Sequence, residues 1–340
     1  MVKLIDKFNR EINYLRISVT DRCNLRCVYC MPASGIAQKD HSRILSFEQI
    51  YKIVNAASGI GINKIRITGG EPLVRKDLPC LIKNLKAIDG LREIALTTNG
   101  IYLSEYAGLL KKSGLDRINI SLDSLVPEKF EMITRGGRLQ PLLRGVESAL
   151  SAGLTPLKIN VVLLKGFNTD EIPAFVNLTK EMPIQVRFIE YMSTGVDYLS
   201  YDELFFSSKD AKNIASSIGK LIRTENAPLG TAEVFRIEGF RGTIGFISAL
   251  SSPFCSTCNK LRLTSDGFLR SCLHSSKTIN LKQALDKGAS QEDLANLIRE
   301  AVILKPESHN LSDHFAGKVS SVNSTADFEP ENFSMCQIGG

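Results

Sequence analysis

Residues 64–72 read KIRITGGEP, and this stretch carries the pattern that decides the fold. Its first five residues are rich in β-branched side chains, which favour a strand, and glycines at 69 and 70 end that strand at once. Other strand-like runs also end in turns, at Asn99-Gly100 and at Asp123-Ser124. Polar residues therefore collect directly after strands, and in a β/α barrel that end of the strands carries the active site.

Strand-like and helix-like segments alternate on both sides of this stretch. We predict strands at 14–19, 64–68, 93–97, 116–121, 156–162 and 185–190. Apolar residues three or four positions apart predict helices near 47–58, 78–87, 105–113, 141–152 and 170–180. Such alternation is typical of parallel strands joined by crossover helices. The predicted fold class is therefore α/β, an incomplete TIM-like (β/α)6 barrel that ends near residue 190.

The pattern changes after the sixth strand. We expect a connection, a helix, a hairpin and two further helices, in that order, at 192–207, 208–219, 232–248, 279–287 and 290–303. The last part of the chain, after residue 303, is rich in Ser, Asn, Asp and Glu, and we expect it to be an extended tail. This part of the chain is therefore expected to be a smaller α+β extension of the barrel.

The composition is that of an ordinary globular protein. The chain has 340 residues, of which 43% are hydrophobic and 23% charged, and its net charge is +6. This charge suits an anionic small molecule, but it is too small and too dispersed to favour a nucleic-acid partner. No apolar stretch reaches the ~18 residues of a membrane span, and charges interrupt the first residues where a signal peptide would be apolar. The sequence therefore predicts a cytoplasmic protein without a nucleic-acid or membrane partner.

Three cysteines lie close together after the first predicted strand. Cys23, Cys27 and Cys30 have the spacing C-x3-C-x2-C, one thiolate short of the four that a four-iron cluster usually takes. One iron would be left open, which is what a catalytic metal centre needs. A structural zinc is the alternative. It usually takes a fourth Cys or His, and the nearest histidine, His41, has no recognisable spacing.

This first triplet resembles the signature of the radical S-adenosylmethionine superfamily, in which an aromatic residue, here Tyr29, precedes the last cysteine. The resemblance implies that S-adenosylmethionine chelates the open iron and is cleaved by one electron to a 5′-deoxyadenosyl radical. It also implies that the loop Gly69-Gly70-Glu71-Pro72 contacts the methionyl amino group. Read alone, this loop is equally compatible with a simple turn, because glycine permits both a turn and close approach to a ligand.

A second triplet is formed by Cys255, Cys258 and Cys272. We interpret it as a second iron–sulfur cluster with another open iron, and a mixed zinc site with His274 is the alternative. Lys260 and Arg262 lie at alternate positions between these cysteines, so they would share one face of a strand. Two cations beside an open iron favour an anionic substrate, phosphate above all, whereas the other interpretation is a solvated basic strand.

The two triplets together resemble the GTP 3′,8-cyclase family of molybdenum cofactor biosynthesis. The blocks that carry the resemblance are LRISVTDRCNLRCVYCMP at 15–32, KIRITGGEPLVRKDL at 64–78, LTTNG at 96–100, INISLD at 118–123, KINVV at 158–162, RFIEYM at 187–192, FCSTCNKLRLTSDG at 254–267 and the final Gly339-Gly340. The resemblance implies a partial barrel at 1–195 and an extension at 196–340 that carries the second cluster. It also implies conversion of GTP to 3′,8-cyclo-7,8-dihydro-GTP, in which the adenosyl radical removes the ribose 3′ hydrogen and the ribose carbon attacks C8 of guanine.

The resemblance also implies cofactors and site residues by position. Two 4Fe–4S clusters would be held by Cys23, Cys27, Cys30, Cys255, Cys258 and Cys272. S-adenosylmethionine would be bound by Tyr29, Gly69, Gly70, Glu71, Ser121 and Met192. GTP would be bound by Arg16, Lys64, Arg66, Thr97, Lys158, Arg187, Lys260 and Arg262. The candidate catalytic residues are Arg262, Gly339 and Gly340, because the family's tail is thought to reach into the active site.

The charges of these residues are consistent with a GTP site. Several of the cations lie on predicted strands, where buried charges are rare. A triphosphate carries about four negative charges, which are costly to desolvate without partners. The chain departs from the family at Lys260, where arginine is usual, so the charge is kept but the two-pronged hydrogen bonding is lost.

The sequence also leads to expectations about the protein's partners, and two other functions compete with the one above. The resemblance implies an external one-electron reductant, a downstream cyclic pyranopterin monophosphate synthase and a homodimer. One competing function is a radical S-adenosylmethionine enzyme that acts on a peptide or another small molecule, although the peptide enzymes usually carry a longer C-terminal array of cysteines. The other is a zinc-stabilised binding module, which predicts zinc and no iron.

Overall fold

The computed structural model describes residues 3–192, 201–224 and 231–309. Its strands form one mixed 12-stranded sheet in the order β12-β11-β10-β1-β2-β3-β4-β5-β6-β9-β8-β7. The strands in the middle of this order are β1 Tyr14–Ser18, β2 Lys64–Thr68, β3 Glu93–Thr98, β4 Arg117–Ser121, β5 Leu157–Leu163 and β6 Gln185–Glu190. They pair in parallel in chain order, which confirms the predicted α/β barrel.

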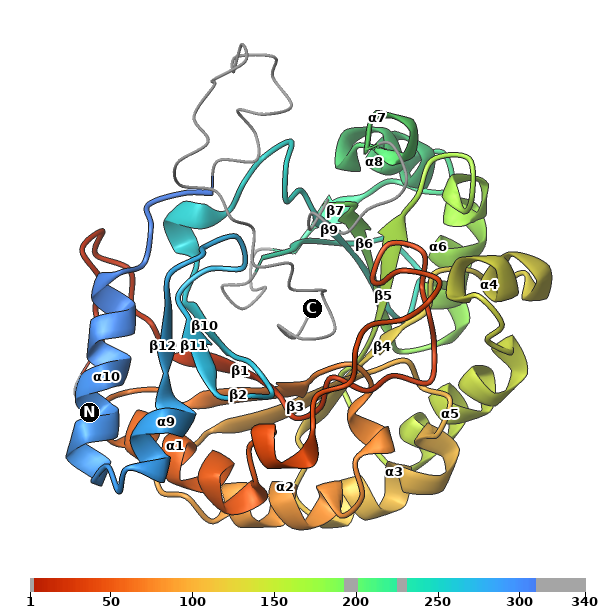
Figure 1. The fold of residues 1–340 in the computed structure, drawn as a ribbon. Helices are drawn as coiled ribbons and strands as arrows, with labels where there is room; N and C mark the ends of the chain where they lie inside the picture. Colours follow the sequence, from red (N-terminus) through yellow and green to blue (C-terminus); the bar gives the residue numbers. More distant parts are fainter. Residues whose placement is uncertain (1–2, 193–200, 225–230, 310–340) are drawn as a thin grey trace.

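Helices cover the outside of these strands, and the other face of the curved sheet turns inward (Figure 1). They are α1 Phe47–Gly59, α2 Leu78–Lys86, α3 Leu103–Lys112, α4 Pro127–Thr134, α5 Leu139–Ser151 and α6 Ile172–Glu181. Local signals account for their starts; Ser46 and Gln49, for example, form a capping box at the beginning of α1. The sequence analysis missed α4, because its eight residues offer only a weak apolar pattern.

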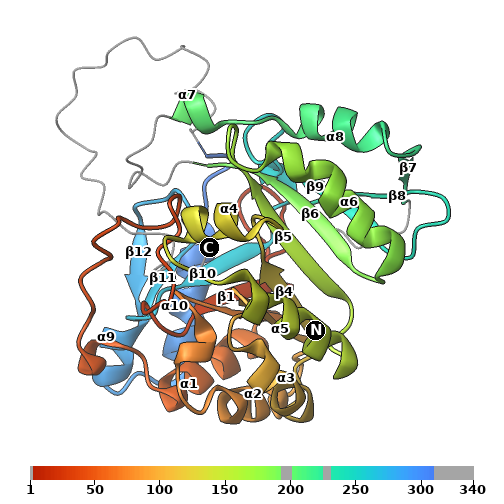
Figure 2. The ribbon, with the colours of Figure 1, turned by 90° about the vertical axis from the view of Figure 1, so that its right-hand side faces the viewer.

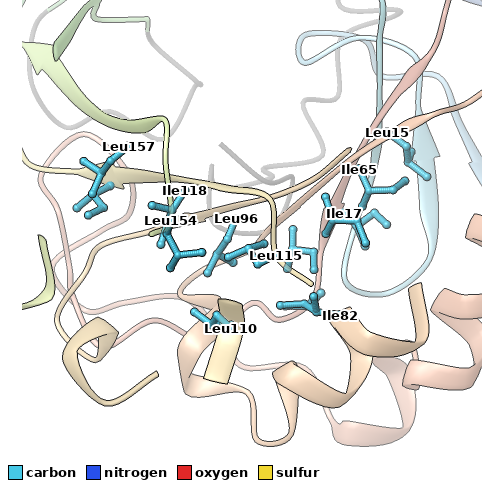
Figure 3. Packing of buried hydrophobic residues seen from close by; sticks show 14 of the residues in the cluster. Leu15, Ile17, Ile65, Ile82, Leu96, Leu110, Leu115, Ile118, Leu154 and Leu157 are labelled. Carbon is cyan, nitrogen blue, oxygen red and sulfur yellow. The ribbon is translucent and has the colours of Figure 1, made fainter. Parts of the chain in front are cut away.

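The hydrophobic core lies between the outer face of the strands and the helices. Leu15 of β1, Ile65 of β2 and Ile82 of α2 are buried in it (Figure 3). Successive strand side chains point to opposite faces, so Arg16 and Arg66 point to the inside of the barrel. The same alternation that builds the core therefore lines the interior with cations.

The later strands extend both edges of the barrel sheet. They are β7 Ile222–Arg223, β8 Glu233–Arg236, β9 Thr243–Ile247, β10 Lys260–Leu263, β11 Phe268–Arg270 and β12 Thr278–Asn280. β9 pairs in parallel with β6 and β10 in parallel with β1, and antiparallel strands continue the sheet on each side (Figure 2). The predicted hairpin is confirmed as β8 and β9, and the predicted strand with Lys260 as β10.

The sequence did not predict that these strands would join the barrel itself. A pairing such as Tyr14 with Lys260 joins residues far apart in the chain, and no local pattern reveals it. The barrel and the extension therefore share one continuous sheet. The division of the chain at residue 195 stays a prediction.

The described part of the C-terminal half also contains the helices α7 Tyr201–Leu204, α8 Ser208–Ser216, α9 Leu281–Asp286 and α10 Gln291–Ile303. The last three confirm predicted helices. α7 falls within the predicted connection at 192–207, of which 193–200 lie outside the described residues. Single 3-10 turns occur at His41–Arg43, Pro72–Val74, Thr169–Glu171 and Cys255–Thr257. Across the described ranges, none of the helices combines the length and apolar character needed to span a membrane.

Candidate active site

The first cysteine triplet lies in the loop that follows β1. The backbone N–H groups of Cys30 and Met31 both donate to the carbonyl oxygen of Cys27, at 2.9 and 3.2 Å, so this segment forms a tight turn. Burial raises the pKa of the Cys27 thiol, and the charges of Asp123 and Cys23 raise it further. A thiolate in such a place needs a positive partner, which a metal centre provides.

The first triplet provides three thiols within a single loop. Among the described residues, no group of three or more His, Cys, Asp or Glu side chains is placed to hold one metal ion. A four-iron cluster binds each thiolate through a different iron, so its thiols need not meet at one point. Within the described residues, Cys23, Cys27 and Cys30 are not joined in disulfides, and the charge of Cys23 acts on Cys27. These features agree with the donor set of an iron–sulfur cluster.

The loop after β2 packs directly against the loop that carries the first triplet. The N–H of Gly70 donates to the carbonyl of Thr20, and the N–H of Glu71 to the carbonyl of Arg22, both at 2.8 Å. Gly69 has a φ of +149°, and a Cβ there would lie 2.5 Å from the Thr20 carbonyl oxygen. A Cβ on Gly70 would clash with the Arg22 carbonyl oxygen. The two glycines therefore permit a backbone contact that holds the cysteine loop in place.

Glu71 is an internal anchor of this region and is only 1% exposed. Its carboxylate accepts hydrogen bonds from the N–H of Leu73 at 2.9 Å, from Thr98 Oγ1 at 2.7 Å and from the N–H of Asn99 at 2.7 Å. Burial raises the pKa of Glu71 to about 7. Asn99 in turn donates to the side chain of Asn24 at 2.8 Å, so Glu71 links the ends of β2 and β3 to the cysteine loop. Its predicted contact with the cofactor stays a prediction.

Tyr29 is held by a carboxylate that the sequence analysis did not assign to the site. The Tyr29 hydroxyl donates to Asp123 Oδ2 at 2.6 Å, and the N–H of Val162 donates to Asp123 Oδ1 at 2.8 Å. Burial raises the pKa of Asp123 to about 6, and burial together with Asp123 raises that of Tyr29. The position of Asp123, two residues after the end of β4, is visible in the sequence, but its partner Tyr29 is remote in the chain.

A row of arginines crosses the inner face of the barrel at one level. Arg16 of β1 is in register with Arg66 of β2 on one side and with Arg262 of β10 on the other. Burial lowers the pKa of Arg16 well below its usual value, and Arg262 and Arg66 lower it further. The three predicted substrate residues therefore share one space.

Lys158 and Arg187 bring further positive charge to this space from β5 and β6. Burial lowers the pKa of Arg187 to about 9, with contributions from Arg66 and Arg117. Burial, and then Arg187, lower the pKa of Lys158 to about 7. These cations lie close enough for the charge of one to lower the pKa of another, and such accumulated charge favours an anionic ligand.

Neutral side chains orient two of these arginines. Arg66 donates from Nε to the Tyr14 hydroxyl at 2.5 Å and from Nη1 to Thr97 Oγ1 at 3.1 Å. Arg187 donates from Nη2 to Asn160 Oδ1 at 2.5 Å. The predicted residue Thr97 is thus brought to the site, while the sequence analysis missed Tyr14 and Asn160.

Other predicted residues lie at the margins of this site. Lys64 is the first residue of β2 and pairs in register with Tyr14 and Glu93, so it lies at the amino-terminal end of the strands. Ser121 is the last residue of β4. Met192 follows β6 and is partly buried. Gly339 and Gly340 lie outside the described residues, so their predicted role stays a prediction.

The second triplet flanks β10 and β11. Cys255 begins a 3-10 turn, Cys258 follows that turn and donates its N–H to the Cys255 carbonyl at 3.1 Å, and Cys272 follows β11. Burial would raise the pKa of the Cys258 thiol, but Lys305 and Lys260 outweigh it and lower this pKa. Burial also lowers the pKa of Lys260, to about 8. The site therefore favours a thiolate.

Arg262 connects the second triplet to the barrel interior. Burial lowers its pKa, while the neighbouring thiols of Cys272 and Cys258 act to raise it. His274 packs edge-to-face against His309, with ring centroids 5.4 Å apart. Burial, with His309, lowers the pKa of His274 to about 3, so its ring is neutral at pH 7.

Known protein families match both the segment with the first cysteine triplet and the segment with the second. A sequence model of the Radical SAM superfamily matches residues 17–179, and one named Molybdenum Cofactor Synthesis C matches residues 184–311. Proteins named GTP 3′,8-cyclase from Clostridium botulinum (strain Okra / Type B1) and Petrotoga mobilis are 47% and 45% identical over 99% of this chain and 100% of their own length. Another from Peptoclostridium acidaminophilum is 49% identical over 91% of this chain and 94% of its own.

Solved structures share the fold. SuiB of Streptococcus suis bound to S-adenosylmethionine superposes with a TM-score of 0.62 at 17% identity, over 86% of this chain and 69% of that chain. At this identity the likeness concerns the fold alone.

Proposed function

The chain belongs to the GTP 3′,8-cyclase family within the radical S-adenosylmethionine superfamily, and from this membership we propose that it converts GTP to 3′,8-cyclo-7,8-dihydro-GTP. This is the first step of molybdenum cofactor biosynthesis. The family uses S-adenosylmethionine and an iron–sulfur cluster and acts on a small molecule. The residues of this chain that serve these ligands form the finer part of the proposal.

The first triplet and its neighbours would hold the radical-generating cofactors. When bound, the cluster and S-adenosylmethionine supply one-electron cleavage and abstraction of the ribose 3′ hydrogen. Cys23, Cys27 and Cys30 would provide the thiolates. Tyr29, fixed by Asp123, would line the S-adenosylmethionine site together with Gly69, Gly70, Glu71, Ser121 and Met192.

The observation that carries the substrate assignment is the row Arg262, Arg16 and Arg66 on the inner face of the barrel. Guanidinium groups bind phosphate oxygens through paired N–H donors, and a triphosphate would neutralise this buried charge. Lys158 and Arg187 approach from the opposite strands. We therefore assign the triphosphate to these residues, with Lys64, Thr97 and Lys260 around them.

Cys255, Cys258 and Cys272 would hold a second 4Fe–4S cluster, whose open iron would meet the guanine. The support is the lowered pKa of Cys258, which favours the thiolate that a cluster needs. Arg262 lies beside two of these thiols and also in the arginine row, so it would contact GTP between cluster and phosphates. We assign it a catalytic role.

The two terminal glycines would complete the catalytic set. Glycine has no side chain, so a diglycine end with its carboxylate could enter a narrow site. We expect that removal of Gly339 and Gly340 abolishes GTP conversion but leaves the iron content unchanged, as measured by product and metal analysis on the same preparation. Full turnover without them would contradict the assignment.

The partners that we propose are those that membership of the family implies. An external one-electron reductant would supply the electron, and a cyclic pyranopterin monophosphate synthase would take the product onward. A homodimer is the expected assembly.

The assignment can be tested with anaerobically purified protein reconstituted with iron and sulfide. With S-adenosylmethionine and a strong reductant, the protein should consume GTP, and 5′-deoxyadenosine and a cyclised product should form together as GTP is lost. Deoxyadenosine without loss of GTP would contradict the substrate and favour a radical enzyme with another substrate, such as a peptide. Zinc in place of iron would contradict the radical chemistry as well.

A further inference from the structure

A short segment after α10, residues 304–307, is linked by hydrogen bonds to the segments that carry the second triplet, either directly or through Arg10. Lys305 is 4% exposed, and its Nζ donates to the carbonyl of Lys260 at 2.9 Å and to the carbonyl of Ser271 at 2.6 Å. Lys260 lies two residues after Cys258, and Ser271 directly precedes Cys272. Lys305 therefore joins the two segments that carry these cysteines.

Arg10 makes a similar link to the remaining cysteine of the triplet. Its guanidinium donates to the Cys255 carbonyl at 2.8 Å, to the Glu307 carbonyl at 2.9 Å and to the Pro306 carbonyl at 2.6 Å. The same guanidinium forms an ion pair with the buried Asp6 at 2.6 Å. The charge of Arg10 is therefore balanced within the protein.

Lys305 differs from Arg10 in this respect within residues 3–192, 201–224 and 231–309. In the part of the chain that the structure describes, no carboxylate lies within ion-pair distance of its ammonium group. Its two partners are neutral carbonyl groups. A buried ammonium without an anion is costly, so a negative group is expected near it. The two carbonyl groups to which Lys305 donates lie in the segments that carry Cys258 and Cys272, whose thiolates would supply this negative charge.

We propose that Lys305 is a positioning residue for the second cluster: it holds the Cys258 and Cys272 segments together and balances the negative charge of the thiolate-bound cluster. This inference rests on the proposed second cluster and adds a role for a residue outside both triplets and the arginine row. A fixed positive charge stabilises the more negative, reduced state of a nearby metal centre. Lys305 would therefore raise the reduction potential of the second cluster relative to that of the first.

Four variants of the full chain separate charge from structure. Lys305→Met removes the charge and both hydrogen bonds, and Lys305→Gln removes the charge but keeps an amide donor. Lys305→Arg keeps the charge. Lys277→Met is the matched control, because Lys277 is exposed and lies in the same segment as Cys272. Solvent screens its charge.

The readout is a redox titration of each reconstituted protein followed by electron paramagnetic resonance, with Cys255→Ala identifying the signal of the second cluster. In Lys305→Gln and Lys305→Met we expect reduction of that cluster to become on the order of tenfold less favourable, which corresponds to about 59 mV for one electron. The first cluster should keep its potential, and Lys305→Arg and Lys277→Met should resemble the unaltered chain.

The outcomes distinguish this inference from the proposal on which it depends. If the unaltered chain holds two clusters and Lys305→Gln leaves the second potential unchanged, the charge role of Lys305 is overturned while the second cluster stands. If the unaltered chain binds only about four irons and Cys255→Ala loses none, the second cluster itself is refuted, and the role of Lys305 with it. Should Lys305→Met fail to fold, Lys305→Gln and Lys305→Arg decide.

Discussion

The pKa of Lys158, about 7, makes its charge depend on pH near neutrality. Burial and Arg187 disfavour the charged form in the empty site, whereas a bound polyphosphate would favour it. GTP binding should therefore be accompanied by proton uptake above pH 7. The affinity should be nearly constant below pH 7 and fall as pH rises above it, by up to about tenfold per unit.

Equilibrium GTP binding measured from pH 6 to 9 at constant ionic strength tests this. Lys158→Arg is the matched variant, because a guanidinium has a higher ordinary pKa than an ammonium group and keeps its charge further into this range. Its affinity should fall less steeply with pH than that of the unaltered chain. Identical slopes in the two proteins would assign the pH dependence to another group.

Residue types and spacing were sufficient to predict the residues that carry the chemistry, but not the residues that hold them. The triplets and the strand cations are visible because cysteine spacing and buried-strand charges are unusual in themselves. Asp123 and Asn160 were missed because their roles come from contacts with Tyr29 and Arg187, which lie elsewhere in the chain. The sequence places Asp123 after a strand, but it does not reveal which distant side chain each of these residues contacts.

At the scale of elements, the loop after β2 can contact the cysteine loop because residue 70 is a glycine and has no side chain. Gly70→Ala would place a methyl group against the Arg22 carbonyl, and backbone cannot move aside as a flexible side chain could. We expect a loss of about 1–3 kcal/mol in the free energy of unfolding and weaker retention of iron by the first triplet. Urea unfolding and iron analysis measure the two effects.

Gly108→Ala is the control for this substitution. Gly108 lies in α3, and nothing stands within 4 Å of a Cβ built there. Alanine should be neutral or slightly stabilising at that position, because it favours the helix. Equal iron retention in the two variants would contradict a specific role for the Gly70 contact.

Glu190, the last residue of β6, joins three elements and is 1% exposed. Its carboxylate accepts hydrogen bonds from the N–H of Ser208 at 2.9 Å, of Leu250 at 2.9 Å and of Ser251 at 3.0 Å, and from the Ser251 hydroxyl. Residue 251 lies four positions before Cys255. Glu190 therefore fixes the start of α8 and the approach to the second triplet.

Glu190→Gln should lower the free energy of unfolding by about 1–3 kcal/mol, because an amide NH2 group cannot accept from the backbone donors that face it. Denaturant titration measures this loss. Glu238→Gln provides the comparison, since Glu238 is exposed and should tolerate the change. Similar stability of both variants would show that the hydrogen bonds of Glu190 are replaceable.

Elements with a local signal were predicted well, and elements defined by distant partners were not. Predicted and observed limits of the β1 to β6 strands agree to within a residue or two, since each is a short β-branched run. β11 and β12 have three residues each and exist as extensions of β10, so their pattern is too short to be read alone. The pairing of β9 and β10 with the barrel edges lies beyond any local pattern.

At the scale of the whole molecule, both edges of the six-stranded barrel sheet are covered by later parts of the chain. A chain that ends at residue 195 would expose the backbone of β1 and of β6, because β10 and β9 would be missing. Open strand edges pair with other chains, so this fragment should aggregate. The measurement is the soluble fraction after expression and size-exclusion chromatography.

A chain that ends at residue 309 keeps the described strands of both edges and serves as the control. It should be soluble and fold cooperatively. A soluble, cooperatively folding fragment 1–195 would instead support a division of the protein into independent parts. That result would contradict the importance of the shared sheet for stability.

The pairing of β1 with β10 also has a consequence for synthesis on the ribosome. Tyr14 emerges early, but its partner Lys260 follows only after most of the chain has been made. At a synthesis rate of ~5–20 residues per second, the outer edge of β1 remains unpaired for roughly tens of seconds. The loop with Cys23, Cys27 and Cys30 directly follows that strand. Stable loading of the first cluster is therefore expected after translation has passed the second triplet, although its ligands are translated first.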